Sequence, residues 1–533
     1  MKRNNTVVKA IQSLLVAFLA AGSLSPCAVT GDSNTPDLRN GSSYADSAWL
    51  FGIPGAMSFD DSGWMYADRL GFFKGDYPWI YVEGSEWWYT SPDGWWYPYS
   101  MRHGTPANQS ISADKWGEIE GKVSASMAKY QIPGIAYAVK FAGQDPIVRA
   151  LGVRDVASGE ALRPTDRFRI GSTSKSFMGV AILQLIANGS IGIDHPVGMY
   201  LPDNVLTGYD REAITIRMLL QHTSGINNYT NVIDEWNVPY IFERDRVWRM
   251  EELVAMVDAN VNREEPWLGK LFEPGSSWSY SNTNTVLLGI ILERVSGLAV
   301  SDYLNRKVIP AAGLTQTYSP NPGESEIRGE HSRGYMDWQD FTGADFVPAG
   351  LSDVTVYDPT GVGPAGAIVS TVGDLTRWAE ALAFNRSLIP SEIQQLHVNT
   401  HGFIATSLNL PSVSCGFHLI KELDQMHASA VPNIAHRGQI SGYDTVMMYL
   451  TEVDCAIVMV CNRTLPMQGD HVISGLEVGV YEMINVLFPE MVAKWREPFL
   501  GSAPMDQLSV HSNESPSSRS QSAPFRAFPL SEY

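Results

Sequence analysis

Ser172 and Lys175 lie three residues apart at the start of a long apolar segment, and this pair constrains the fold and chemistry of the chain more than any other feature. Gly171 interrupts the run before them, and apolar side chains then recur as on the wide buried surface of a helix. They are Phe177, Met178, Val180, Ala181, Leu183, Leu185 and Ile186. We therefore expect Ser172 to begin a helix. Residues i and i+3 share a helix face, so the lysine amine can reach the serine oxygen, as covalent acyl transfer requires.

A serine three residues before a lysine is a weak signal by itself, because the same pattern usually marks a solvated helix face. Two further motifs favour the catalytic interpretation. Tyr280-Ser281-Asn282 follows a turn at Glu273-Pro274-Gly275, and His436-Arg437-Gly438 lies in a strand-like stretch.

These three motifs, in this order, resemble those of the penicillin-recognising serine hydrolases, which include class C β-lactamases, D-alanyl-D-alanine carboxypeptidases and related esterases. The resemblance runs from about residue 112 to about residue 490 and includes Gln221-His222-Thr223-Ser224-Gly225 and Pro364-Ala365-Gly366. It implies an α+β, β-lactamase/transpeptidase-like fold, in which an antiparallel sheet flanked by helices joins a mostly helical subdomain.

The resemblance also implies a role for each motif. Ser172 would attack a carbonyl carbon while Lys175 and Tyr280 handle the proton between them. Asn282 would hold the amide of the substrate and help to place Lys175. The backbone N–H groups of Ser172 and Gln439 would form an oxyanion hole, in which one donor is typically worth about 10² to 10³ in rate.

The third motif departs from the β-lactamase pattern, because it begins with His436 where many β-lactamases have lysine. The ordinary pKa of histidine, about 6.5, makes a second cation near Tyr280 conditional on pH. We therefore expect activity to respond to pH between about 6 and 8, and we favour a carboxypeptidase or esterase over a β-lactamase. Gly438 is expected because a side chain there would obstruct a substrate lying along the strand.

Arg437 is unusual in a position that is commonly small. One interpretation is that its guanidinium binds an acidic end of the substrate. The alternative is that it points away to solvent, since alternate residues of a strand face opposite ways.

Other catalytic or metal-binding patterns are weaker. His222 could be taken for a base, but its setting indicates a helix end closing into a turn. The 11 histidines show no His-Glu-x-x-His spacing, and the cysteines form no Cys-x-x-Cys pair. We predict no metal and no cofactor.

The sequence at both ends of the predicted catalytic region indicates strands of a single antiparallel sheet. An opening hairpin is expected over 135–148 and 149–156, with a first helix before it over 116–129. Further strands are expected over 416–421, 434–439, 445–450 and 456–460, with a closing helix over 472–487. The middle, roughly 176–390, is expected to be mostly helical.

Composition and the two ends of the chain limit the possible partners and the cellular location of the protein. A net charge of -19 argues against nucleic acid as a partner. Residues 1–27 resemble a secretory signal peptide, with basic residues, a short apolar core and Cys27, so we expect an exported, periplasmic or secreted protein. Lipidation of Cys27 is an alternative that Pro26 disfavours. No later stretch is long and apolar enough to span a membrane.

The regions flanking the predicted hydrolase domain, 113–495, differ from it. Residues 47–100 hold seven of the 15 tryptophans in repeated Trp-x-Tyr units separated by Gly and Asp turns, which indicates short hairpins. This aromatic module either binds cell wall or packs its rings into its own core. Residues 101–112 are a predicted linker, and the Ser/Pro-rich tail over 500–533 is predicted to be disordered.

The remaining cysteines are predicted to be structural. Cys455 and Cys461 are six residues apart in one strand-like run, which places them about 20 Å apart, beyond disulfide reach. Cys415 could reach one of them only from a neighbouring strand, and buried free thiols are the default.

The leading hypothesis is a serine hydrolase that forms an acyl-enzyme on Ser172 and acts on D-alanyl peptides, β-lactam-like amides or esters. The partner is then a small-molecule or peptide substrate. A carboxylesterase on the same fold is the first alternative. The second is an envelope-binding protein with little turnover, which the intact Ser172, Lys175, Tyr280 and Asn282 disfavour.

Overall fold

The computed structural model describes most of the region predicted to be catalytic. Its described residues are 110–232, 240, 243–262, 269–338, 350–384, 388–390, 393, 433–465 and 475–493. The backbone is also described for short strands within 57–98 and 413–422. The predicted signal peptide, the predicted tail and all but the last three residues of the predicted linker lie outside the described residues. Residue contacts divide the chain into two units, 1–107 and 108–533.

The described backbone of the first unit forms six short strands in two antiparallel sheets. Their bounds are β1 (Met57–Ser58), β2 (Trp64–Ala67), β3 (Gly71–Lys74), β4 (Trp79–Tyr81), β5 (Trp87–Thr90) and β6 (Trp96–Pro98). The hairpin prediction is confirmed, because β4 pairs with β5 and β5 with β6. The register aligns Tyr89 with Trp79 on one side and with Tyr97 on the other. Ligand binding by these repeats stays a prediction.

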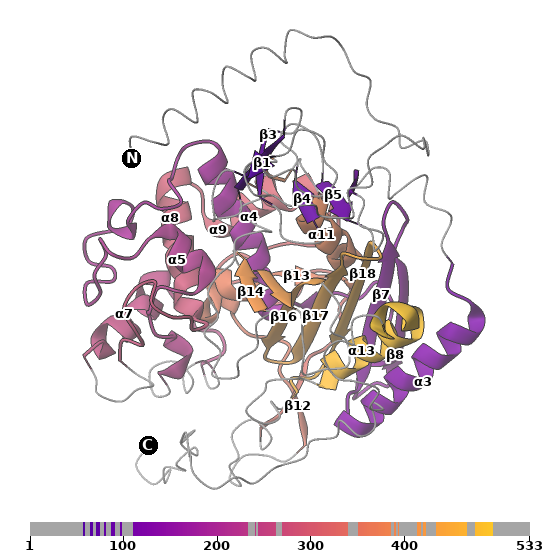
Figure 1. Cartoon of the computed structure of the whole chain (residues 1–533). Coiled ribbons are helices and arrows are strands. Elements are labelled where there is room, and N and C mark those ends of the chain that lie inside the picture. Colours follow the sequence, from indigo (N-terminus) through magenta and orange to yellow (C-terminus); the bar gives the residue numbers. More distant parts are fainter. Residues whose placement is uncertain are drawn as a thin grey trace, which may run out of the picture. The chain divides into compact units, whose positions relative to one another are not determined.

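The second unit is built around an eight-stranded antiparallel sheet of order β14-β15-β16-β17-β18-β7-β8-β9. Its strands are β7 (Gly134–Phe141), β8 (Ile147–Asp155), β9 (Glu160–Ala161), β14 (Val413–Gly416), β15 (Leu419–Glu422), β16 (Asn433–Ile440), β17 (Tyr443–Leu450) and β18 (Cys455–Cys461). Because β18 pairs with β7, both ends of the region contribute to one sheet, as predicted. The α+β fold with its helix-flanked antiparallel sheet is confirmed (Figure 1).

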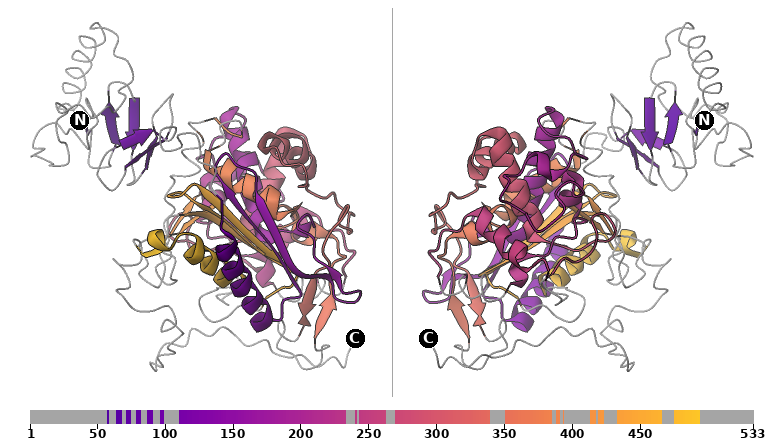
Figure 2. Two further views of the ribbon diagram at one scale, coloured as in Figure 1. Left: turned by 90° about the vertical axis from the view of Figure 1, so that its right-hand side faces the viewer. Right: turned by 90° about the vertical axis from the view of Figure 1, so that its left-hand side faces the viewer.

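Helices cover both faces of this sheet, which explains why β7, β17 and β18 are buried along their whole length. Helices α3 (Ala113–Tyr130) and α13 (Gly475–Leu487) lie side by side on one face (Figure 2). Lys115 of α3 donates through Nζ to the Leu487 carbonyl at 3.0 Å. Helices α4 (Ser174–Ala187) and α11 (Val372–Phe384) belong to the core of the other face.

The helical region adjoins the α4 face (Figure 1). It contains α5 (Ile216–Gln221), α7 (Met250–Asn260), α8 (Asn282–Ser296) and α9 (Val300–Tyr303). Among the described helices, no single one is long and apolar enough to cross a membrane. Only α8 taken together with 300–312, across a bend of 74°, passes that test of length and composition. Leu287, Leu288 and Ile291 of α8 are fully buried in the core.

Two local predictions need correction. The strand expected over 416–421 is two strands, β14 and β15, which pair with each other. Cys415 lies on β14, and three strands separate β14 from β18, so Cys415 is not on a strand neighbouring Cys455 or Cys461. Those two cysteines are free and buried, as expected.

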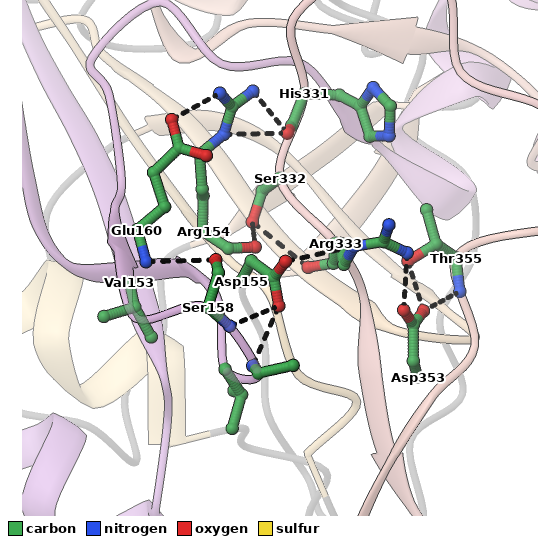
Figure 3. Close-up of polar contacts among 12 residues, drawn as sticks. Val153, Arg154, Asp155, Ser158, Glu160, His331, Ser332, Arg333, Asp353 and Thr355 are labelled. Atoms are coloured by element: carbon green, nitrogen blue, oxygen red, sulfur yellow. Dashed lines mark hydrogen bonds and ion pairs between the residues drawn. The ribbon is translucent and has the colours of Figure 1, made fainter.

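A polar network attaches the segment 331–333 to strand β8 (Figure 3). Arg154 of β8 donates through Nη2 to the carbonyl of His331 at 2.6 Å and pairs with the buried Asp166 at 2.9 Å. Arg333 lies between Asp155 and Asp353, with N–O distances of 3.5 and 2.7 Å. These arginines compensate the acidic side chains around them, so the network is a structural connection between β8 and β12 (Leu351–Asp353).

Candidate active site

Ser172 lies in the 3₁₀ turn Gly171–Thr173, which continues directly into α4. This agrees with the prediction that it begins a helix. Gly171 has φ +51, a left-handed conformation that glycine adopts without a steric penalty. Ser172 is half-buried, whereas the residues on either side of it are buried. Ser172 is therefore more accessible to solvent than its two neighbours in the turn.

Lys175 is fully buried one helical turn after Ser172. Its Nζ donates to Ser172 Oγ at 2.9 Å and to the Ala365 carbonyl at 2.8 Å. Burial away from water holds the pKa of Lys175 well below its usual range. A lowered pKa makes the amine lose its proton more readily, and a free amine at this distance can accept the serine proton. Sequence reasoning missed the Ala365 carbonyl, because only the tertiary fold brings the 363–365 turn to α4.

Tyr280 lies just before α8, and its ring centroid is 4.9 Å from Lys175 Nζ. Burial raises the pKa of its phenol above the usual value, and a hydrogen bond with Ser172 acts in the opposite direction. The phenol is therefore protonated at neutral pH. Lowering the pKa of a phenol from about 10 to about 7 needs about 4 kcal/mol from neighbouring charges. Burial outweighs the lowering contribution from Ser172, so Tyr280 keeps its proton and is suited to donate it.

Two glycines bring β16 against the turn that carries Ser172. A Cβ on Gly438 would lie 1.9 Å from the Ile170 carbonyl oxygen, and a Cβ on Gly171 would lie 2.8 Å from the Gln439 backbone nitrogen. The reason for Gly438 thus differs from the predicted one: it permits contact between two backbones. This contact places the backbone N–H groups of Ser172 and Gln439 close together, as an oxyanion hole requires.

His436 lies on the same face of β16 as Gly438 and is buried. Its Nδ1 contacts the Arg437 carbonyl oxygen at 2.6 Å, and because a carbonyl can only accept, Nδ1 carries the proton. Burial first, and then the nearby Lys175, lower the pKa of His436 to about 3. The expectation that His436 titrates between about pH 6 and 8 is therefore wrong. Desolvation, which the sequence does not reveal, keeps the imidazole neutral.

Arg437 faces the opposite side of the sheet, toward α13. Its Nη2 lies 2.6 Å from Oε1 of Glu477, whose side chain is only 2% exposed. Its cross-strand partner Val446 belongs to the core under α3 and α13, whereas Met447, opposite His436, belongs to the α4 core. Recognition of a substrate carboxylate by Arg437 is therefore not supported. The alternative is right that alternation turns Arg437 away from the site, but the side chain is only 31% exposed and its guanidinium pairs with a buried carboxylate.

The two remaining predicted residues contribute mainly through their backbones. Gln439 directs its side chain away from Ser172 and donates through Nε2 to the Leu465 carbonyl at 2.8 Å. Asn282 is the first residue of α8, and its N–H donates to Asn228 Oδ1 at 3.2 Å. Within the described residues no hydrogen bond joins Asn282 to Lys175, whose donors go to Ser172 and Ala365.

His222 ends α5 in a left-handed conformation and is buried, which agrees with a structural role rather than that of a base on Ser172. Its ring nevertheless lies against the ring of Tyr280, with 4.7 Å between the centroids. Over the described parts of the chain, no group of three or more His, Cys, Asp or Glu residues is arranged to hold a metal ion.

Comparison with known proteins agrees with this geometry. The family model described as Beta-lactamase matches residues 119–477, more than half of the chain. The chain belongs to the beta-lactamase family. The match confirms the resemblance over residues 119–477.

Two similar proteins differ in the length over which they match this chain. Penicillin-binding protein 4* of Bacillus subtilis (strain 168) is 25% identical over 340 residues, which are 63% of this chain and 69% of that protein. Protein flp of Staphylococcus aureus (strain COL) is 23% identical over 290 residues. That match spans about half, 53%, of the length of flp.

Solved structures of the same fold include a D-stereospecific amidohydrolase and a D-amino acid amidase. A D-stereospecific amidohydrolase from Streptomyces sp. is 26% identical, with a TM-score of 0.57 over 70% of this chain and 98% of that chain. The D-amino acid amidase from Ochrobactrum anthropi SV3 is 22% identical, with a TM-score of 0.58 and the same coverage. The second likeness concerns the fold alone.

Proposed function

We propose that this beta-lactamase-family serine hydrolase forms an acyl-enzyme on Ser172 and cleaves amides or esters of D-amino acids, including D-alanyl peptides. The observation that carries the proposal is the 2.9 Å contact between Lys175 Nζ and Ser172 Oγ, made by a lysine whose pKa burial holds well below its usual range. A lysine that loses its proton readily and a serine hydroxyl at this distance can act as a base and its nucleophile.

The protonation states of the two proton-carrying residues assign their steps. Lys175 Nζ accepts the proton of Ser172 as Oγ bonds to the substrate carbonyl carbon. The oxygen of that carbonyl becomes negative between the N–H groups of Ser172 and Gln439. When the bond to the leaving nitrogen or oxygen breaks, Tyr280 donates its phenolic proton to that atom and recovers one from Lys175. Water then attacks the acyl-enzyme and releases the acid.

The charges around β16 favour a substrate without a carboxylate next to the scissile bond. His436 is neutral because its pKa is about 3, and Arg437 is engaged by Glu477 on the far face. Neither side chain therefore supplies a positive charge to a terminal carboxylate, as a carboxypeptidase would require. The 26% identical D-stereospecific amidohydrolase supports an amide of a D-amino acid.

A matched set of substrates tests this proposal. D-alanyl-D-alanine peptide, its C-terminal amide, D- and L-alanine p-nitroanilide, a penicillin and an activated ester are each incubated with the protein. Substrate loss and intact mass are followed, with Ser172→Ala as the blank. We expect a serine-dependent adduct or turnover with the D-configured amides, faster than with the free peptide.

The other outcomes identify the alternatives. Turnover of the activated ester alone indicates a carboxylesterase. Preference for the free D-alanyl-D-alanine carboxylate contradicts the argument from His436 and Arg437. Adducts with neither esters nor amides, in a folded protein, contradict the acyl-enzyme and favour an envelope-binding role.

A further inference from the structure

His222 is a buried imidazole that the proposed reaction does not use. It is 4% exposed and ends α5 with φ 58. Its Nδ1 lies 3.3 Å from the backbone nitrogen of Ser281 and 3.2 Å from Nδ2 of Asn284. Ser281 is the residue between Tyr280 and Asn282, so the imidazole contacts the backbone of the proposed catalytic motif.

Hydrogen-bond chemistry determines the protonation state of this ring. A backbone N–H can only donate, so Nδ1 must accept from Ser281, and a neutral imidazole then carries its proton on Nε2. Asn284 fits the same assignment, because its Oδ1 accepts from Ser224 Oγ at 2.7 Å and leaves Nδ2 to donate. Burial, Lys175 and His436 all lower the pKa of His222 well below its ordinary value. The acceptor on Nδ1 therefore persists at neutral pH.

The loop that begins at His222 makes several hydrogen bonds to the segment that leads into α8. The His222 carbonyl accepts from Ser279 N–H at 3.0 Å, and the Thr223 carbonyl accepts from Gly275 N–H at 2.8 Å. The Asn227 carbonyl accepts from the hydroxyls of Ser281 and Thr283 at 3.0 and 2.7 Å. These contacts are all accepted by backbone carbonyls of the loop, so they do not depend on the His222 side chain. That side chain alone adds a contact at Ser281 N–H together with a ring against Tyr280.

We propose that His222 is a positioning residue for Tyr280. Its neutral imidazole fixes the backbone between Tyr280 and Asn282 through Nδ1, and its ring limits where the phenol ring can lie. This inference rests on the proposed function only for its kinetic consequence, since the position of Tyr280 can be measured without a substrate. A misplacement of about 1 Å can cost about 10²-fold in rate, which is the size of effect expected here.

Three variants separate positioning from simple stability. His222→Asn keeps an acceptor at the position of Nδ1 and tolerates the left-handed backbone, whereas His222→Ala removes the acceptor. Ser224→Ala is the matched control, because it removes the Ser224 hydrogen bonds with Asn284 Oδ1 and the Ile226 N–H and leaves Nδ1 and the Tyr280 ring contact in place. For each variant the acylation rate of Ser172, the KM, the thermal midpoint and a crystal structure are determined.

We expect His222→Ala to acylate about 10²-fold more slowly at nearly constant KM, with the Tyr280 ring displaced by about 1 Å. His222→Asn should recover at least about tenfold of that rate, and Ser224→Ala should lose stability with little change in rate. Equal rate losses in His222→Ala and Ser224→Ala, no recovery in His222→Asn, or an unmoved Tyr280 would overturn the proposal. If none of the substrates acylates Ser172 of the parent protein, the proposed function is contradicted. The crystal structures then still test whether His222 positions Tyr280.

Discussion

Replacing Gly438 with alanine tests whether the close contact between β16 and the Ser172 turn sets the reaction rate. The added Cβ would lie 1.9 Å from the Ile170 carbonyl oxygen and 3.0 Å from the Thr173 backbone nitrogen. Both of those atoms are backbone, so no side chain can rotate away. The strand and the turn must separate by about 1.1 Å before the Cβ–oxygen distance reaches 3.0 Å.

This separation acts directly on the proposed oxyanion hole, because one donor belongs to Ser172 and the other to Gln439. Loss of one such donor costs about 10² to 10³ in rate. We expect Gly438→Ala to reduce the acylation rate by that factor, with an overpacking cost of about 1–3 kcal/mol in the free energy of unfolding. The hydroxyl of Ser172 and its contact with Lys175 remain within one helical turn and are less affected.

The assay is a quenched single-turnover acylation followed by intact mass, run beside calorimetric unfolding. Gly117→Ala is the control, because no atom lies within 4 Å of its added Cβ on α3. It should stabilise the protein by about 0.5–1 kcal/mol and leave acylation unchanged. A Gly438→Ala protein that folds and acylates within a few-fold of the parent would refute the argument from backbone contact.

Two further predictions concern the buried charges around β16. Because the pKa of His436 is about 3 in the folded protein and ordinarily 6.5, the unfolded chain binds a proton as pH falls below 6.5 while the folded chain does not. The free energy of unfolding therefore decreases as the pH is lowered through this window. This group accounts for about 2 kcal/mol of the decrease between pH 6.5 and pH 5. His436→Gln should reduce that slope in urea unfolding, and equal slopes would contradict the assignment. Arg437→Met leaves the Glu477 carboxylate buried without this partner and should cost about 3 kcal/mol in the free energy of unfolding, while Arg437→Met with Glu477→Leu should recover most of it. Acylation should be unchanged in both, so a slower Arg437→Met with parental stability would indicate that the guanidinium contacts substrate.

The parts of the site that were predictable are those set by neighbouring residues. Ser172 and Lys175 are one helical turn apart, so their contact follows from helix geometry wherever the helix lies. The alternation of side chains along a strand also predicts which face of the sheet Arg437 lies on. If Gly438 contacts the Ser172 turn, then the residue before it must face the other side of the sheet.

The parts that were mispredicted depend on burial and on contacts between distant segments. His436 was assigned the pKa of a solvated imidazole, and only the assembled fold shows that it lies inside the protein beside Lys175. Asn282 was expected to help place Lys175, but that lysine donates to the carbonyl of Ala365, which is 190 residues away. His222 was correctly placed at a helix end, yet nothing in its local sequence indicates its contact with Ser281.

The family, the antiparallel sheet formed from both ends of the region, and the contact between Ser172 and Lys175 could all be predicted from the sequence. Periodicity, turn residues and i, i+3 spacing are local properties, so they do not depend on how distant segments of the chain fold. The tertiary structure alone decided which groups carry charge. A pKa depends on how much water reaches a group and on which charges lie nearby, and both are set by segments far away in the chain. For that reason Lys175 is suited to be a base, Tyr280 to be a proton donor, and His436 to remain neutral.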